Sequence, residues 1–421
     1  MIRKVYKFGG ASVKDAAAVR NLRSILEKEN RSEIMLVISA MGKTTNAIEK
    51  ALANFRANNG HLEIGALSEI IEYHENIMTE LFEGNTSHPI FETMTNLFLD
   101  LYLNLQETGF DYDYQYDNTV SFGEMLSTTL ISAYLNECGI RNELIDARDY
   151  IVTDHGFRSA NPEWDDCRLR IEKLKSNESV MYITQGFIAS SVSPKTTTTL
   201  GREGSDFSAA IFANCLDAEE LTIWKDVDGL RNADPKRFTD TKKISHLSYF
   251  EAIELAFYGA SVIHPKTLKP LQNKNIPLKV RSFLDIGLEP TIIDGTKDYI
   301  EYVPSFIVKE KQTLMSVTPR DYSFMNEHNR ALIFNVMDEL NIHANMTQIS
   351  ALVLSICFDE DEKKRIQLTE TLSQSFKIKY NDGLQLFTIR HYRDGLEKDF
   401  IAGKNIYVEQ RSRSTYQIVT D

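Results

Sequence analysis

The stretch from Thr197 to Ala210 contains the residues best suited to bind a small anion. β-Branched residues lead into a turn with two glycines, and an apolar run follows, which indicates a strand, a turn and a helix. Either Ser205 or Asp206 is expected to cap that helix, whose first N–H groups and dipole favour an anion. Arg202 in the turn could grip a carboxylate through two parallel hydrogen bonds. The stretch therefore indicates a site for a short acid, although an ordinary turn with a solvated arginine explains it equally well.

A second anion site is predicted near the N-terminus, where Ile2–Phe8 reads as a strand and Val13–Leu26 as a helix. Gly9 and Gly10 begin the turn between them, so its amides and the adjacent Lys7 could cradle a phosphate. The turn is not a Walker A loop, because no Gly-Lys-Ser/Thr follows at the right spacing. A solvated lysine before a turn is the alternative.

The strand expected at Glu33–Ala40 is apolar along nearly its whole length, which predicts burial on both faces. Ser39 and the polar loop Met41–Asn46 stand at its C-terminal end, where ligands bind in open α/β sheets. A ligand site is therefore expected there. Helical patterns continue from about Ala47 to Leu105.

Glu124 has two explanations in the sequence. Ser121 and Glu124 have the spacing of a capping box, in which the glutamate closes the first turn of a helix. The alternative is a carboxylate in a pocket that holds an ammonium group. The preceding segment, Asp111–Asp117, alternates acids with tyrosines and is expected to be a surface loop.

Polar residues also follow the strand expected at Leu221–Trp224. Asp226 and Asp228 lie two residues apart, so both could face a ribose, a metal ion or water. A turn at Asp228 and Gly229 would use the aspartate for geometry alone. His264 precedes a proline, and a structural hydrogen bond is expected of it rather than catalysis.

The composition limits the classes of function. The length of 421 residues predicts two to three domains, and 42% hydrophobic with 25% charged residues is ordinary for a soluble protein. A net charge of −13 argues against a nucleic-acid coat and against binding to an anionic membrane. The four cysteines contain no Cys-x-x-Cys pair, so a reducing cytosol is the expected setting. No apolar segment of signal-peptide or membrane length stands at the N-terminus.

The pattern changes after a polar linker at Gly295–Pro304, which is the predicted domain boundary. Strands and helices then follow in the order βαββαβ, the ferredoxin-like arrangement, which ends with a strand at Phe376–Tyr380. Further strands are expected at Leu384–Ile389, Ile406–Glu409 and Thr415–Val419, without helices of comparable length.

Several motifs resemble, in order, those of aspartokinases, which are enzymes of the amino-acid kinase fold with C-terminal ACT-type modules. The matching segments are Lys7–Ser12, Ser121–Glu124, Thr197–Asp206, Trp224–Gly229 and Gly259–Pro265. The resemblance implies an α/β sandwich with a mainly parallel central sheet over residues 1–300. It implies a ferredoxin-like, ACT-type βαββαβ region over residues 301–421, whose first unit is complete and whose second, at about 381–421, is shortened.

The resemblance also implies ATP-dependent phosphorylation of the side-chain carboxylate of L-aspartate to 4-phospho-L-aspartate, the first step towards lysine, threonine and methionine. That carboxylate has an ordinary pKa of about 3.9, so it is an ionised nucleophile and needs no general base. Lys7 and Asp206 would be catalytic. The residues that would bind the amino acid are Thr45, Glu124, Arg202 and Ser205. The residues that would bind ATP are Lys7, Gly9, Gly10, Ser12, Ser39, Lys225, Asp226, Arg231 and Lys236. Mg²⁺ would arrive on the nucleotide, without protein ligands.

Other functions remain open at this point. A kinase of another acid, such as glutamate, differs by one methylene, which is worth little discrimination. A decayed kinase that serves as an amino-acid sensor is the competitor from another class, but the intact Lys7, Arg202 and Asp206 argue against it. Ser261, Arg231 and Lys236 depart from the family pattern, and all three stand at positions that the resemblance assigns to nucleotide binding.

The C-terminal region is expected to join two chains in a homodimer and to carry an effector site. The effector-binding residues of the family correspond here to Asn345, Gln348 and Ser350. Asn345 and Ala351 stand where lysine-sensitive members have carboxylates, so weak or absent inhibition by lysine is expected. Asn345, Gln348 and Ser350 can still hydrogen-bond a neutral hydroxyl amino acid such as threonine, while a dimerisation scaffold without an effector is the alternative.

Overall fold

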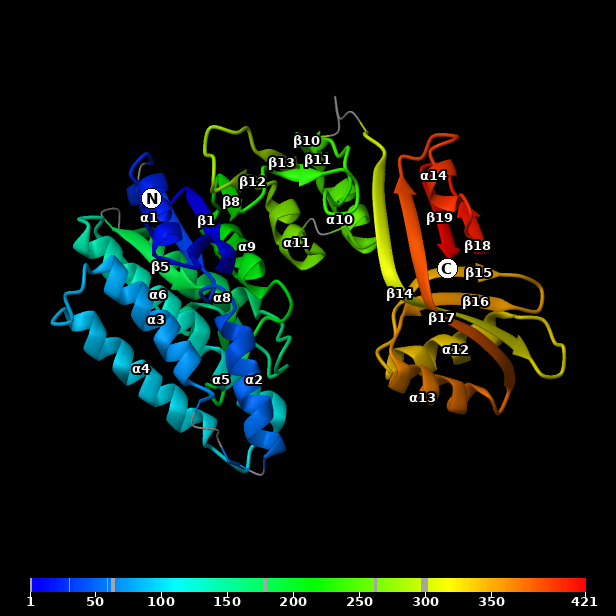
Figure 1. Cartoon of the computed structure of the whole chain (residues 1–421), viewed down its shortest axis with the longest axis horizontal. Coiled ribbons are helices and arrows are strands. Elements are labelled where there is room, and N and C mark those ends of the chain that lie inside the picture. Colours follow the sequence, from blue (N-terminus) through cyan, green and yellow to red (C-terminus); the bar gives the residue numbers. More distant parts are fainter. Residues whose placement is uncertain are drawn as a thin grey trace. The chain divides into compact units, whose positions relative to one another are not determined.

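The computed structural model describes residues 2–29, 31–58, 60–61, 65–176, 180–260, 263–296 and 302–421 (Figure 1). Ser261 and residues 297–301, which are half of the predicted boundary Gly295–Pro304, lie outside these residues. The chain forms two compact units. The first comprises Met1–Leu230, Ser245–Ala252 and Ile263–Asp298, and the second comprises Arg231–Ile244, Ile253–Val262 and Tyr299–Asp421.

The first unit is built on a mainly parallel sheet, as predicted. Its strands, in spatial order, are β11 (His246–Ser248), β13 (Thr291–Asp294), β12 (Leu278–Ser282), β8 (Glu220–Lys225), β1 (Lys4–Phe8), β2 (Ile34–Ile38), β5 (Met181–Gln185) and β3 (Asn142–Ile145). Among the described strands of this sheet, the antiparallel pair is β12 with β13. All five residues of β2 are buried, which explains the continuous apolar run that the sequence shows there.

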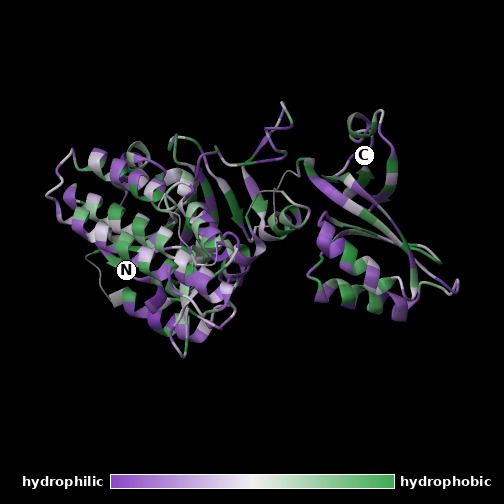
Figure 2. Cartoon of the chain, turned by 60° about the horizontal axis from the view of Figure 1, so that its bottom comes forward, coloured by the Kyte–Doolittle hydropathy of each residue, from purple (hydrophilic) through white to green (hydrophobic). Residues whose placement is uncertain are grey.

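Helices cover this sheet and alternate hydrophobic with hydrophilic positions (Figure 2). The helices that begin in this unit are α1 (Ala16–Leu26), α2 (Thr44–Ala57), α3 (Ser68–Leu81), α4 (Pro89–Leu105), α5 (Tyr112–Val120), α6 (Phe122–Glu137), α7 (Ala147–Tyr150), α8 (Trp164–Ile171), α9 (Gly204–Leu216), α10 (Tyr249–Phe257) and α11 (Pro265–Lys274). Helix α9 is buried along its whole length, and it packs on β1. No helix of the described residues is long and apolar enough to cross a membrane.

Successive side chains of β1 point to opposite faces of the sheet. Tyr6 and Phe8 belong to a core that includes residues of α1, α3, α4 and α6. Lys7 lies between them in the strand, so its side chain points to the opposite face, where α9 packs. One lysine is thereby placed at the carboxyl end of a central strand, facing the start of a buried helix.

A small sheet supports the loops beside α9. It consists of β4 (Val152–Thr153), β6 (Ile188–Ser191) and β7 (Thr197–Thr199). The predicted surface loop at Asp111–Asp117 is wrong, because Tyr112–Val120 forms helix α5 and Asp117 is fully buried. Its carboxylate accepts hydrogen bonds from the backbone N–H and the hydroxyl of Thr199. This acidic residue therefore has a buried hydrogen-bond partner and does not face solvent.

The second unit contains the predicted βαββαβ order and a six-stranded sheet. Its elements are β9 (Leu230–Arg231) and β10 (Lys243–Ile244), which pair together, and then β14 (Ser305–Pro319), α12 (Glu327–Glu339), β15 (Ala344–Ile349), β16 (Leu354–Asp359), α13 (Glu362–Leu372), β17 (Phe376–Arg390), α14 (Lys398–Ile401), β18 (Ile406–Arg411) and β19 (Thr415–Thr420). The six-stranded sheet runs in the order β15-β16-β14-β17-β19-β18, with antiparallel neighbours.

The strands predicted separately at Phe376–Tyr380 and Leu384–Ile389 are one strand, β17. The residues between them resemble a turn, but they form an irregularity in the pairing with β14 instead. Gly383 has a φ of 71° there, and its N–H donates to the Glu360 side chain. The long strands β14 and β17 therefore run through the whole sheet.

Candidate active site

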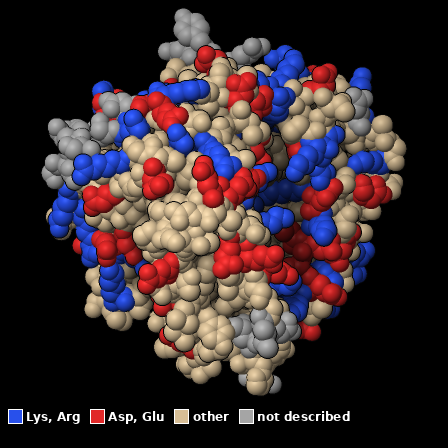
Figure 3. Space-filling view, turned by 60° about the vertical axis from the view of Figure 1, so that its left-hand side comes forward, with Lys and Arg blue, Asp and Glu red and all other residues tan. Residues whose placement is uncertain are grey.

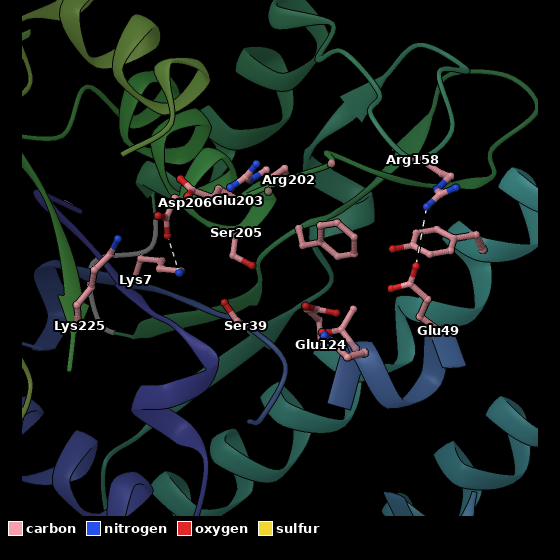
Figure 4. A pocket seen from close by; sticks show the side chains of 16 residues that line it. Lys7, Ser39, Glu49, Glu124, Arg158, Arg202, Glu203, Ser205, Asp206 and Lys225 are labelled. Carbon is pink, nitrogen blue, oxygen red and sulfur yellow. Dashed lines mark ion pairs between the residues drawn. The ribbon is translucent and has the colours of Figure 1, made fainter. Parts of the chain in front are cut away.

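A cavity of about 710 Å³ opens beside the start of α9 (Figure 4). Its lining residues are Lys7, Ser39, Thr45, Asn46, Glu49, Tyr116, Glu124, Arg158, Phe187, Gly201, Arg202, Glu203, Gly204, Ser205, Asp206 and Lys225. The sequence predicted Lys7, Ser39, Thr45, Glu124, Arg202, Ser205, Asp206 and Lys225 as ligand-binding, and the structure brings these residues together. Basic and acidic side chains are interspersed on the face of the chain that Figure 3 shows.

Lys7 and Asp206 form an ion pair at the wall of the cavity. The distance from Lys7 Nζ to Asp206 Oδ1 is 2.5 Å, and both residues are more than 90% buried. Asp206 lies in the first turn of α9, where the helix dipole favours a negative charge. A buried charge pair of this kind keeps its geometry, because separating the partners would leave an uncompensated charge. The ammonium group of Lys7 is therefore held in place against the cavity.

The glycine turn after β1 is closely packed. A Cβ on Gly10 would lie 2.7 Å from the Gly42 carbonyl oxygen, so the two loops approach only because Gly10 has no side chain. A Cβ on Gly9 would lie 3.3 Å from Lys7 Nζ, which places the turn beside the ammonium. The Ser12 hydroxyl is buried and donates to the Trp224 carbonyl at 3.1 Å, so in this structure it ties the turn to β8.

The capping-box explanation of Glu124 is wrong. Helix α5 ends one residue before Ser121, whose hydroxyl donates to the Asn118 carbonyl and caps nothing. Glu124 Oε1 accepts from the Ala40 N–H at 3.3 Å, and among the described residues the buried Oε2 has no hydrogen-bond partner. Burial raises the pKa of Glu124 to about 8, against the opposing effect of the Lys7 charge. An unsatisfied buried carboxyl oxygen in a cavity is a place for a donor from a ligand.

This raised pKa predicts how stability depends on pH. The folded chain holds a proton on Glu124 that the unfolded chain releases near pH 4.5, so the free energy of unfolding falls as pH rises from about 4.5 to about 8. We expect Glu124→Gln to remove this dependence, with a slope difference of up to about 1.4 kcal/mol per pH unit. Denaturant unfolding at pH 5, 6.5 and 8 measures it. Glu75→Gln, at an exposed position of α3, is the control, and parallel curves for Glu124→Gln and wild type would contradict the assignment.

The arginine turn before α9 differs from the prediction in its cap. The helix begins at Gly204, so Ser205 and Asp206 lie inside its first turn and neither caps it. A Cβ on Gly186 would lie 2.5 Å from Ser205 Cβ, so the end of β5 lies close against this turn. Within the described part of the chain no hydrogen bond or ion pair holds the exposed Arg202 guanidinium. It is available to an anionic ligand.

His264 has the structural role that was predicted for it. Its ring Nδ1 accepts from the Lys266 backbone N–H at 3.2 Å and caps α11, and the His264 backbone N–H donates to Glu203 Oε2 at 3.0 Å. Lys266 Nζ donates to the Ser159 hydroxyl. These contacts fix the loops beside the arginine turn.

The predicted nucleotide residues are not all brought together. Lys225 lines the cavity, whereas Asp226, Arg231 and Lys236 do not. Arg231 donates to the carbonyl and hydroxyl of Thr241, and the Lys236 N–H donates to Asp234. Arg231 and Lys236 belong to the second compact unit. Their role toward a nucleotide stays a prediction.

Arg158, Glu49 and Tyr116 also line the cavity, although no motif in the sequence pointed to them. The alternating acids and tyrosines before Ser121 were the signal for Tyr116, because a helix there would turn some of these side chains inward. No comparable pattern surrounds Arg158. Within the described residues, no group of three or more His, Cys, Asp and Glu side chains is arranged to hold a metal ion.

Comparison with known proteins agrees with this geometry. Residues 3–282 match the model of the amino acid kinase family. Aspartokinase 2, chloroplastic, of Arabidopsis thaliana is 30% identical over 370 residues, which are 84% of this chain and 66% of that protein. A bifunctional aspartokinase/homoserine dehydrogenase 2, chloroplastic, of the same plant is 28% identical over 90% of this chain, but the chain spans only 42% of its length.

Solved structures are similar over the whole chain. E. coli aspartokinase III in complex with aspartate and ADP has a TM-score of 0.83 and 25% identity, with 100% of this chain and 96% of that chain covered. The aspartate kinase of Clostridium acetobutylicum has a TM-score of 0.77 at 20% identity over 99% and 96% of the two chains, which supports the fold alone.

Proposed function

The chain belongs to the amino acid kinase family, and on this premise we propose that it transfers the γ-phosphoryl group of ATP to the side-chain carboxylate of L-aspartate. One observation carries the proposal. The cavity joins a fixed ammonium, an unpaired guanidinium and an unsatisfied carboxyl oxygen, on Lys7, Arg202 and Glu124. These groups complement a phosphoryl group, a carboxylate and an ammonium, which are the charges of the two substrates. Similarity to aspartokinases supports the same choice.

The reaction forms one bond from a carboxylate oxygen to phosphorus and breaks the bond from phosphorus to the bridging oxygen of ADP. The acceptor carboxylate is ionised at neutral pH, so positioning and charge stabilisation are what the protein supplies. Lys7 stabilises the transferring group, and Asp206 holds Lys7. Arg202 binds the α-carboxylate, and Thr45 and Ser205 line the space beside it. The α-ammonium donates to the unsatisfied Oε2 of Glu124, and its positive charge favours the ionised form of that buried carboxyl. Mg²⁺ carried by the nucleotide would supply further neutralisation of phosphate charge.

The test is ADP release by the full chain with MgATP and L-aspartate, L-glutamate or neither amino acid. Aspartate-dependent release well above the other two supports the proposal. Preference for glutamate would assign the chain to another amino-acid kinase. If ADP release stays at the level of the blank with both amino acids, the result would reject the kinase activity and favour an amino-acid sensor.

We assign catalysis to residues 1–300 and regulation to residues 301–421, and propose that the second region joins two chains. Both edges of its sheet, β15 and β18, expose apolar side chains, namely Ile349, Ile406 and Tyr407. Unpaired strand edges with such side chains are suited to association.

The free cysteines suit a reducing compartment such as the cytosol.

A homodimer is the expected result of sedimentation equilibrium at micromolar concentration. The double variant Ile349→Lys/Ile406→Lys should shift the chain toward monomer, because it places charge on both edges. Leu169→Lys, at an exposed leucine of α8, should leave the dimer intact. A monomeric wild-type chain would reject the proposal.

Inhibition by lysine is expected to be weak or absent. Asn345 Oδ1 already accepts from Lys309 Nζ at 2.7 Å, and its amide group donates to Gln312 and Asp359. An incoming ammonium would have to displace this internal lysine. Gln348 and Ser350 are likewise bonded within the chain, to the carbonyls of Glu409 and Val353.

Initial rates at sub-saturating aspartate, with and without millimolar lysine or threonine, measure this expectation. A change below about twofold with lysine is expected, since the Lys309 ammonium already occupies the Asn345 side-chain oxygen. Strong lysine inhibition that Asn345→Ala abolishes would contradict it.

A further inference from the structure

Arg158 lies in the cavity but has no part in the function proposed so far. In Figure 4, Arg158 and Glu49 lie at the opposite end of the cavity from Lys7 and Asp206, with Glu124 between them. The phosphoryl group is transferred at the Lys7 end, so the acceptor's reacting carboxylate lies there. Its second carboxylate points away from Lys7, toward the end of the cavity that Arg158 lines.

The backbone of Arg158 is held by a buried carboxylate. Its N–H donates to both oxygens of Asp117, at 3.1 and 3.0 Å, and the same carboxylate accepts from Thr199 N and Oγ1 at 2.9 and 2.7 Å. Asp117 is fully buried. It therefore ties the Arg158 loop to the strand that leads into the Arg202 turn, which fixes the two arginines on one scaffold.

The conformation of Arg158 is one that glycine would adopt more easily. Its φ is 64°, a region that costs a residue with a side chain about 1–2 kcal/mol. Its guanidinium carbon lies 4.3 Å from the ring centroid of Tyr116, in the geometry of a cation–π contact. The aromatic ring supports the guanidinium at the cavity wall, which offsets part of that cost.

The carboxylate partners of Arg158 are loosely attached. Glu49 Oε1 is 3.9 Å from one guanidinium nitrogen and Asp113 Oδ1 is 3.4 Å from another. The side chains of Arg158 and Glu49 are 43% and 42% exposed, so this pair is worth about 0–1 kcal/mol. A ligand carboxylate that accepts two parallel hydrogen bonds from the fork of the guanidinium can outcompete such a contact.

We propose that Arg158 is a second carboxylate-binding arginine of the acceptor site. When the amino acid binds, the Arg158 guanidinium gives up its contact with Glu49 and, together with Arg202, binds the α-carboxylate. The inference rests on the proposed function for the direction in which the acceptor lies. Glu49 restrains Arg158 in the empty chain and does not itself bind substrate.

Calorimetric binding to the full chain, without nucleotide turnover, tests this inference with L-aspartate and its α-amide, which lacks the second carboxylate. Arg158→Gln should weaken aspartate binding about tenfold, the equivalent of one good charge-assisted contact, and change the α-amide less than twofold. Glu49→Gln should strengthen aspartate binding severalfold, because it frees the arginine. Lys195→Gln and Glu80→Gln are the matched controls at exposed positions, and they should leave the binding of aspartate and of its α-amide unchanged.

Equal losses for aspartate and its α-amide in Arg158→Gln would show a structural role and overturn the inference, as would unchanged aspartate binding. Weaker aspartate binding in Glu49→Gln would mean that Glu49 holds the ammonium, and would overturn the inference that Glu49 only restrains Arg158. A wild-type chain that binds aspartate but releases no ADP would refute the proposed function alone. Absence of aspartate binding to the wild-type chain would overturn both.

Discussion

Lys7→Ala is expected to lower kcat by about 10²–10³-fold with little change in the KM for aspartate. In the proposed mechanism the Lys7 ammonium faces charge that develops on the transferring phosphoryl group, and an interaction made mainly in the transition state affects kcat. Steady-state rates of ADP release over a matrix of both substrates measure the effect.

Two controls separate chemistry from folding in this experiment. Lys28→Ala removes an exposed lysine after α1 and should keep wild-type rates. Lys7→Ala also leaves the buried Asp206 carboxylate without its partner, so thermal unfolding of the variant must be followed in parallel. A folded Lys7→Ala chain with near-normal turnover would remove Lys7 from the mechanism.

Arg202→Lys is expected to raise the KM for aspartate by about 10–100-fold while kcat changes only a few fold. A lysine keeps the positive charge but cannot present two parallel donors to the α-carboxylate. Arg202 is exposed and, among the described residues, unpaired, so its replacement breaks no contact that stabilises the fold. Rates at varied aspartate and saturating ATP provide the measurement.

The matched control is Arg31→Lys, which makes the same exchange at an exposed position outside the cavity. It should leave both constants unchanged. If Arg202→Lys raises the KM for ATP instead of the KM for aspartate, the two substrates have been assigned to the wrong ends of the cavity.

The sequence was sufficient to predict the residues whose neighbours in the chain determine their position. Lys7 lies one residue before the end of β1 and Asp206 lies in the first turn of α9, and in a parallel sheet these two positions meet at the carboxyl edge. Arg202 was predictable for the same reason. The resemblance named both Lys7 and Asp206, and the alternation along β1 explains why their side chains meet on one face of the sheet.

The errors have local physical causes. Ser121 looks like a cap only when α5 is read as a loop, and α5 was misread because its acids suggested solvent. The acid that matters there, Asp117, has its partners at Thr199 and Arg158, far along the chain. Arg158 in turn lies in a loop without periodicity, so its place in the cavity depends on contacts that a local pattern does not contain.

The central position of β1 has a consequence for the order in which the chain folds. Residues 4–8 pair on one side with residues 34–38 and on the other with residues 220–224. At about 5–20 residues per second, synthesis separates those two partners by roughly 10–40 s. During that interval β1, which is buried in the folded chain, has no partner strand along one edge, and Lys7 has no Asp206 beside it. The Lys7–Asp206 ion pair therefore cannot form until α9 has been made, and β1 keeps an open edge until β8 follows it.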